Sequence, residues 1–205
     1  MTFKNYLCLL FTAALLSGCS AFQSKPPTPT GNTTHEAQQA ANQWQDWRAT
    51  GKVSVKVDGD NTSANLNWLQ SQDIYAVRLT GPFGQGGADI FGDSNSVRIE
   101  VAGEEPVSSS NPEGLMTEYF GWSLPLDNIH WWLKGVPAPN TKHQIISQLD
   151  QAPGLGRVSE FEQNGWLVSY TQFHTESPYF PRKIRISRDQ VSSLMVIKDW
   201  QRLNK

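Results

Sequence analysis

The sequence has few residues that could form covalent cross-links or catalyse a reaction. It contains two cysteines, and Cys8 lies in an apolar leader that we expect to be removed. The mature chain would keep only Cys19, which excludes an internal disulfide. The four histidines have no partner at the spacing of a zinc motif, and no G-x-S-x-G nucleophile motif occurs. We therefore expect no enzyme activity, no metal and no cofactor.

An excess of charge of one sign is also absent. The 17 basic and 19 acidic residues give a net charge of −2 at pH 7, and no basic stripe occurs. This balance argues against nucleic acid as a partner. Residues 81–87, GPFGQGG, are rich in glycine but lack the Lys-Ser/Thr pair of a phosphate loop. They also lie between two predicted strands, so we expect no phosphate site there.

The chain begins with the pattern of an export signal. A basic residue precedes an apolar run at residues 7–16, which at about ten residues is too short to span a bilayer. Residues 16–19, LSGC, resemble the bacterial lipobox, in which the chain is cut before a cysteine that is then acylated. This resemblance implies a signal peptide at residues 1–18 and a lipid anchor at Cys19. By resemblance to the enterobacterial sorting rule, Ser20 in place of aspartate implies delivery to the outer membrane.

The mature chain divides into a tether and one domain. Residues 19–34 combine the lipidated N-terminus with a Pro-, Ser- and Thr-rich segment that has no periodicity, which is typical of a flexible tether. Residues 35–205 have a length that suits one domain with a substantial core, which we expect to be a monomer. At its start, residues 35–47 predict an amphipathic helix with Trp44 and Trp47 on one face.

The rest of the domain alternates between apolar and polar residues, as in half-buried strands. Strands are predicted at residues 52–58, 62–70, 73–81, 88–91, 95–101, 158–163, 166–173, 183–187 and 191–200. Asn164-Gly165 is a strong hairpin signal between two of them. Between the two groups of strands, proline-opened and glycine-closed segments predict short helices at residues 110–121 and 125–135. This order predicts a strongly curved antiparallel sheet with helices on one side.

A curled sheet under incompletely packed helices can enclose an apolar cavity. A carrier of an apolar ligand should have a contiguous cavity of roughly several hundred Å³ there. The same alternation is the usual mark of an ordinary core, so a lipid-anchored structural or assembly factor with a fully packed core stays an alternative. Lysozyme-like or protease activity is a more distant one. Strand parity and helix faces direct these side chains toward the space: Leu66, Trp68, Val77, Leu79, Ile99, Leu115, Met116, Phe120 and Trp132.

Several segments, in order along the mature chain, resemble the LolB family of outer-membrane lipoprotein receptors. They are WRATGKVSV at residues 47–55, LTGPFGQGGADI at 79–90, PLDNIHWWLKGVPAP at 125–139, the NGW hairpin, and IRISRDQVSSLMVIKDW at 184–200. The resemblance implies a mainly β fold with α: an incomplete, unclosed antiparallel β-barrel of about 10–11 strands with helical lids over an apolar cavity. It also implies that the protein faces the periplasm and accepts lipoproteins, by their acyl chains, from the periplasmic carrier LolA. The protein would then insert this cargo into the lipid of the outer membrane.

The glycine-rich loop carries a lone aromatic residue, Phe83, between Gly81-Pro82 and Gly84. Glycine and proline are turn-formers, so we expect a loop between strands with the phenyl ring at its tip. In the LolB family a protruding loop with a leucine at its tip is implicated in membrane insertion. The resemblance assigns this role to Phe83, with Gly81, Pro82 and Gly84 shaping the loop.

Overall fold

A computed structural model describes residues 33–84, 86–149 and 156–203 of this protein. The expected signal peptide and lipid anchor at Cys19 lie outside these residues. Within the described part of the chain, eleven strands form one antiparallel sheet, which three helices accompany. The helices are α2 (Thr33–Gln43), α3 (Pro112–Phe120) and α4 (Leu126–Trp132). The strands are β1 (Asp46–Val57), β2 (Asp60–Ser71), β3 (Ile74–Thr80), β4 (Gly87–Gly92), β5 (Val97–Val101), β6 (Val107–Ser109), β7 (His143–Gln148), β8 (Val158–Gln163), β9 (Trp166–Phe173), β10 (Pro181–Arg188) and β11 (Val191–Arg202).

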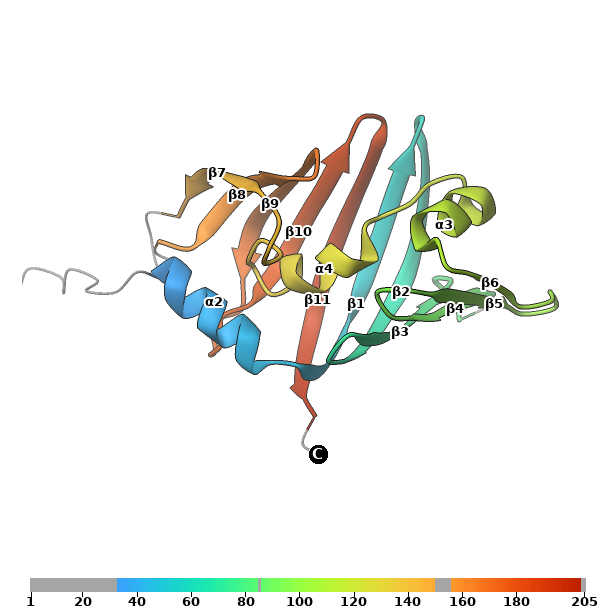
Figure 1. Ribbon diagram of the computed structural model, residues 1–205, viewed down its shortest axis with the longest axis horizontal. Coiled ribbons are helices and arrows are strands. Elements are labelled where there is room, and N and C mark those ends of the chain that lie inside the picture. Colours follow the sequence, from blue (N-terminus) through green and yellow to red (C-terminus); the bar gives the residue numbers. More distant parts are fainter. Residues whose placement is uncertain (1–32, 85, 150–155, 204–205) are drawn as a thin grey trace, which may run out of the picture. The chain divides into compact units, whose positions relative to one another are not determined.

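The strands are arranged in the order β6-β5-β4-β3-β2-β1-β11-β10-β9-β8-β7. Neighbours are consecutive in sequence except at the centre, where the first strand pairs with the last. The sheet is not closed, because β6 and β7 are its two edges. In Figure 1 the strands curve around α4, which lies over the middle of the sheet. The structure thus confirms the predicted mainly β fold with a curved, unclosed antiparallel sheet.

The positions of α3 and α4 follow from this strand order. Since β6 and β7 lie at opposite edges, the segment that joins them has to cross the sheet, and it contains both helices. The side chain of Asn111 accepts a hydrogen bond from the backbone N–H of Gly114 at 3.0 Å and so caps the start of α3. Gly121 ends α3 with φ at 76°, a left-handed conformation that glycine adopts without strain.

A bulge in the central pair of strands contributes to the curvature. The register of β1 against β11 shifts between Thr50 and Gly51. A Cβ atom at Gly51 would clash with the backbone carbonyl of Val196, so the two backbones approach closely only because residue 51 has no side chain. Bulges of this kind bend a strand and increase its twist.

The predicted hairpin is also present, between β8 and β9. Asn164 and Gly165 have φ values of 54° and 73° and connect paired strands through a two-residue turn, as the Asn-Gly sequence predicts. The predicted helix at residues 35–47 is too long, because α2 ends at Gln43. Trp47 instead lies fully buried in β1, where it alternates with Ala49, so Trp44 and Trp47 do not share a helix face. None of the described helices is long and apolar enough to cross a membrane.

Candidate functional site

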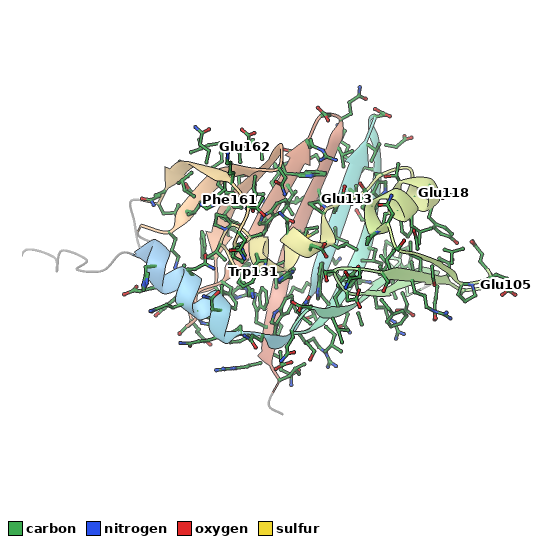
Figure 2. The ribbon with its side chains drawn as sticks, viewed as in Figure 1. Glu105, Glu113, Glu118, Trp131, Phe161 and Glu162 are labelled. Carbon is green, nitrogen blue, oxygen red and sulfur yellow. The ribbon has the colours of Figure 1, made fainter. Side chains whose placement is uncertain are left out.

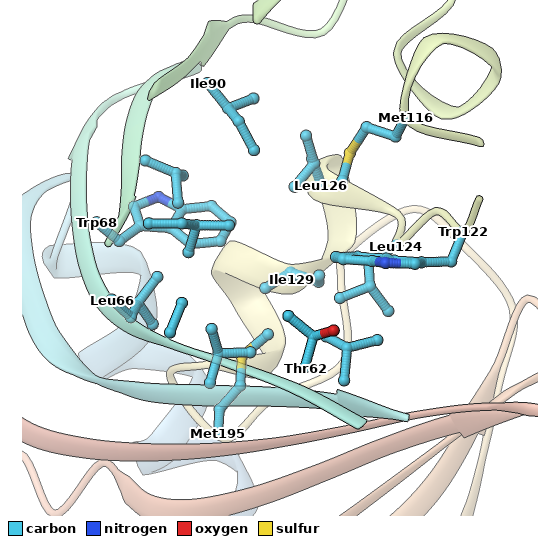
Figure 3. A pocket seen from close by; sticks show the side chains of 15 residues that line it. Thr62, Leu66, Trp68, Ile90, Met116, Trp122, Leu124, Leu126, Ile129 and Met195 are labelled. Carbon is cyan, nitrogen blue, oxygen red and sulfur yellow. The ribbon is translucent and has the colours of Figure 1, made fainter. Parts of the chain in front are cut away.

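An apolar cavity of about 80 Å³ lies between the sheet and the helices that cross it (Figure 3). Its wall contains one polar side chain, that of Thr62. The cavity holds no charged group, so it offers an environment for hydrocarbon and none for acid–base or metal chemistry. Its wall consists of Val53, Val55, Thr62, Ala64, Leu66, Trp68, Val77, Leu79, Ile90, Met116, Trp122, Leu124, Leu126, Ile129 and Met195.

The register of the central strands explains why these side chains meet. Alternate residues of a strand point to the same face, and directly opposite residues of neighbouring strands share a face. Ala64 lies opposite Val53 of β1, whereas Trp68 lies opposite Val77 of β3. Val77 in turn lies opposite Ile90 of β4. Rows of side chains therefore run across β1 to β4 and form the floor of the cavity.

The opposite wall comes from α3, α4 and the segment between them. Met116 is the buried residue of α3, and Leu126 and Ile129 are buried on α4. Figure 3 shows these side chains facing Trp68 and Ile90 across the cavity. The cavity is thus an interface between the sheet and a helical cover.

The cavity is small for a lipid. An engineered apolar cavity of about 150 Å³ holds one benzene molecule, so a space of about 80 Å³ is too small for an acyl chain. It is also below the roughly several hundred Å³ predicted for a carrier of an apolar ligand, so that prediction is wrong for the cavity as this structure has it. An acyl chain would fit between the sheet and the helical cover only if the cover moved away from the sheet.

Buried hydrogen bonds fix one end of this cover. Gln163 of β8 accepts hydrogen bonds from the indole N–H of Trp132 and the backbone N–H of Ala138, both at 2.8 Å, and donates to the Ala138 carbonyl at 2.9 Å. The hydroxyl of Tyr170 donates to the Trp132 carbonyl at 2.7 Å. Gln163 and Tyr170 are almost fully buried, so these bonds hold the C-terminal end of α4 on β8 and β9.

Five of the nine predicted cavity residues lie in the cavity wall: Leu66, Trp68, Val77, Leu79 and Met116. Four do not. Ile99 is buried in β5, one strand beyond the wall, while Leu115 and Phe120 are half-buried on α3. Trp132 is fully buried, but its ring packs edge-on against Phe161 and its N–H bonds Gln163. Helix periodicity gave the apolar face of each helix but not the strand that it packs against.

Sequence reasoning missed the other wall residues. The parity of β1 and β2 contained the signal for Val53, Val55 and Ala64, because each alternates with polar neighbours. Trp122 and Leu124 lie in the irregular segment between α3 and α4, where no periodicity gives a side chain a direction.

The Phe83 loop joins β3 to β4. The N–H of Gly84 donates to the Gly81 carbonyl at 2.9 Å, and the side-chain amide of Asn65 donates to the same oxygen at 3.2 Å. Gly84 has φ at 76°, which a residue with a side chain adopts only with strain. This turn leaves the Phe83 side chain 93% exposed to solvent. Among the described residues, Phe83 is the most exposed of the large apolar side chains.

A second pocket, of about 250 Å³, lies at the C-terminal end of α4 and is partly polar. It includes Lys134, which is almost fully buried and whose ammonium donates to the carbonyls of Ala41 at 2.9 Å and Trp44 at 3.2 Å. Burial lowers the pKa of Lys134 to about 7. Burial and the nearby Lys134 lower the pKa of His130 to about 4. Among the described residues, no group of His, Cys, Asp and Glu side chains is arranged to hold a metal ion.

Comparison of the sequence and the fold with known proteins shows the family of this chain. The family described as Outer membrane lipoprotein LolB matches residues 45–200. A protein of Pseudomonas aeruginosa strain LESB58 named Outer-membrane lipoprotein LolB is 35% identical over 202 residues, which cover 92% of this chain and 91% of the relative. One of Pseudomonas putida strain F1 with the same name is 35% identical over 201 residues, 95% of each chain. The crystal structure of a LolA superfamily protein, NE2245 from Nitrosomonas europaea, has a similar fold, with a TM-score of 0.53 at 10% identity over 84% of this chain and 93% of that one. The chain therefore belongs to the LolB family.

Proposed function

We propose that this protein is an outer-membrane lipoprotein receptor that faces the periplasm. It accepts lipoproteins by their acyl chains from a LolA-type periplasmic carrier and inserts them into the outer membrane without enzymatic chemistry. The observation that carries the proposal is the cavity beneath α3 and α4, whose wall is apolar apart from Thr62. Family membership and the names of the Pseudomonas relatives support the outer-membrane location.

The cost of exposing lipid to water explains why such a cavity is needed. At about 0.8 kcal/mol per methylene, release of a sixteen-carbon acyl chain into water costs on the order of 12 kcal/mol. A lipoprotein with more than one chain cannot diffuse freely, so it has to pass from one apolar environment to another. Exchange between apolar environments of similar quality is nearly neutral. Small differences in affinity at each transfer are then sufficient to set the direction.

Phe83 supplies a contact with the lipid surface in this proposal. Its ring is 93% exposed, so its transfer into lipid removes nearly all of its apolar area from water. Full burial of a phenylalanine side chain contributes about 1.5–3 kcal/mol. This is too little to hold a domain on a membrane but is enough to orient one that Cys19 already anchors there.

A structural or assembly factor of the outer membrane is the second candidate function. The small size of the cavity, about 80 Å³, favours it, because a scaffold needs no internal space. The two candidates differ in whether α3 and α4 open to admit a ligand.

A transfer experiment separates the candidates. A LolA-type carrier loaded with an acylated lipoprotein is mixed with the mature chain carrying Cys19→Ala, which removes its own anchor. The receptor proposal predicts that cargo co-purifies with the Cys19→Ala chain, and that a cavity-blocked Ala64→Leu chain takes up less. Cargo that stays on the carrier under all conditions would exclude the receptor role and leave the scaffold.

A further inference from the structure

The helix α3 is held on the sheet by few contacts. Met116 is its buried residue and reaches the cavity, whereas Leu115, Tyr119 and Phe120 are half-buried. Buried hydrogen bonds fix the C-terminal end of α4, whereas the side-chain hydrogen bonds of α3 and its cap are all in contact with solvent. Gly121, where α3 ends, has no side chain that restricts its backbone. We therefore expect α3 to be the part of the cover that moves when the cavity enlarges.

Apart from the local bond of the Asn111 N–H to the Ser109 hydroxyl, one side-chain hydrogen bond ties α3 to the edge of the sheet. The hydroxyl of Tyr119 donates to the carboxylate of Glu104, which lies in the turn between β5 and β6. This bond raises the pKa of Tyr119. Both groups are in contact with solvent, so breaking the bond leaves no buried polar atom unpaired. A contact of this kind holds α3 closed but can be exchanged quickly.

The Glu104 turn lies beside the Phe83 loop. Both connections are at the same end of the antiparallel strands β3 to β6. A groove of about 530 Å³ has Gly84 and Gly87 of the Phe83 loop in its wall together with Glu104 and Pro106. A surface that receives the Phe83 side chain therefore also comes close to the carboxylate that holds α3.

We propose that Tyr119 and Glu104 form a latch that keeps α3 closed over the cavity, and that contact of the Phe83 loop with lipid releases this latch. The inference rests on the proposed function and adds a control of when the cavity opens. At a lipid surface, ammonium and phosphate groups compete for the Glu104 carboxylate and the Tyr119 hydroxyl. The cavity then opens only at a lipid surface, so an acyl chain that leaves it enters the membrane and is not released into water.

The test uses the mature chain with Cys19→Ala, loaded with dansyl-labelled undecanoic acid, with release followed by dansyl fluorescence. Tyr119→Phe removes only the hydroxyl, and Glu104→Ala removes its acceptor. The matched control is Glu105→Ala, an exposed carboxylate of the same turn that Figure 2 shows at the far end of the sheet. Vesicles of phosphatidylethanolamine and phosphatidylcholine supply the lipid surface.

The latch predicts that vesicles accelerate release from the Cys19→Ala chain without further changes and from the same chain with Glu105→Ala. Tyr119→Phe and Glu104→Ala should release the acid about two- to tenfold faster without vesicles, the range expected for one hydrogen bond, and respond little to them. The double variant should be no faster than either single variant, because both changes remove the same bond. Phe83→Glu should release slowly with or without vesicles.

Three results would overturn the latch while leaving the proposed function in place. The first is an undiminished vesicle response in both Tyr119→Phe and Glu104→Ala, and the second is an equal effect of Glu105→Ala and Glu104→Ala. The third is a normal vesicle response in Phe83→Glu. Failure of the Cys19→Ala chain without further changes to bind the labelled acid would instead overturn the proposed function, and the latch with it.

Discussion

Filling the cavity is expected to stabilise the fold and block the ligand. Ala64 of β2 lies in the cavity wall opposite Val53, and Ala64→Leu adds three carbon atoms directed into the space. At about 0.8 kcal/mol per buried carbon, the limit is roughly 2.4 kcal/mol. Since Ala64 is half-buried and cavity-filling changes commonly give about 0.5–2 kcal/mol, we expect about 1 kcal/mol. This corresponds to a rise in Tm of about 2–4 °C for a domain of this size.

The assay combines thermal unfolding, followed by tryptophan fluorescence, with titration of a labelled fatty acid. A carrier should gain stability and lose affinity for the fatty acid by more than about tenfold, because protein and ligand compete for the same volume. The control is Ala76→Leu, the same change on the opposite face of β3, since Ala76 alternates with the cavity residue Val77. It should leave fatty-acid affinity unchanged. A stabilised Ala64→Leu protein with unchanged fatty-acid affinity would refute the assignment of this cavity to acyl chains.

Phe83→Glu should keep its Tm, because the side chain that changes is 93% exposed. The variant should still accept cargo from the carrier but fail to deliver it to liposomes. Normal delivery to liposomes would contradict the proposed membrane contact of the loop. Gln163→Leu leaves the Trp132 indole N–H and the Ala138 backbone groups without their partner, at about 1–3 kcal/mol each, so chemical denaturation should show a loss of at least about 3 kcal/mol. The exposed Gln144→Leu is its control and should change stability little. Because the pKa of Lys134 is about 7 in the folded chain and 10.5 ordinarily, the unfolded chain binds more protons between these values. The free energy of unfolding should therefore rise with pH across this window, by up to about 4–5 kcal/mol. A Lys134→Met chain whose free energy of unfolding rises with pH just as steeply would contradict the lowered pKa of Lys134.

The fold was predictable where each local signal had one structural solution. Alternation placed Val77 and Leu79 on the inner face because a strand has only two faces, and Asn164-Gly165 fixed the hairpin between β8 and β9. The strands β6 and β7 were not predicted. β6 is three residues long, and nearly all side chains of the edge strand β7 are exposed, so neither has a buried face to produce an alternating pattern.

The cavity was harder to predict than the sheet because it depends on which elements pack together. The pattern around Trp132 identifies a buried helix face, but the partner of that face, Phe161, is fixed by a crossing from one edge of the sheet to the other. Trp122 reaches the cavity from an irregular segment, where side-chain direction is set by tertiary packing alone. The size of a space between elements also depends on small displacements that no sequence pattern records.

The pairing of β1 with β11 constrains when this domain can finish folding. These are two of the longest strands, each with 12 residues, and partners such as Trp47 and Arg202 come from opposite ends of the sequence. Contacts between residues so distant in sequence form slowly, because a long loop has to close first. In a chain that crosses a membrane N-terminus first, β1 lacks one neighbour until the last segment arrives. A polypeptide stalled near its end would thus expose the edge of β1, where it is open to pairing with other chains.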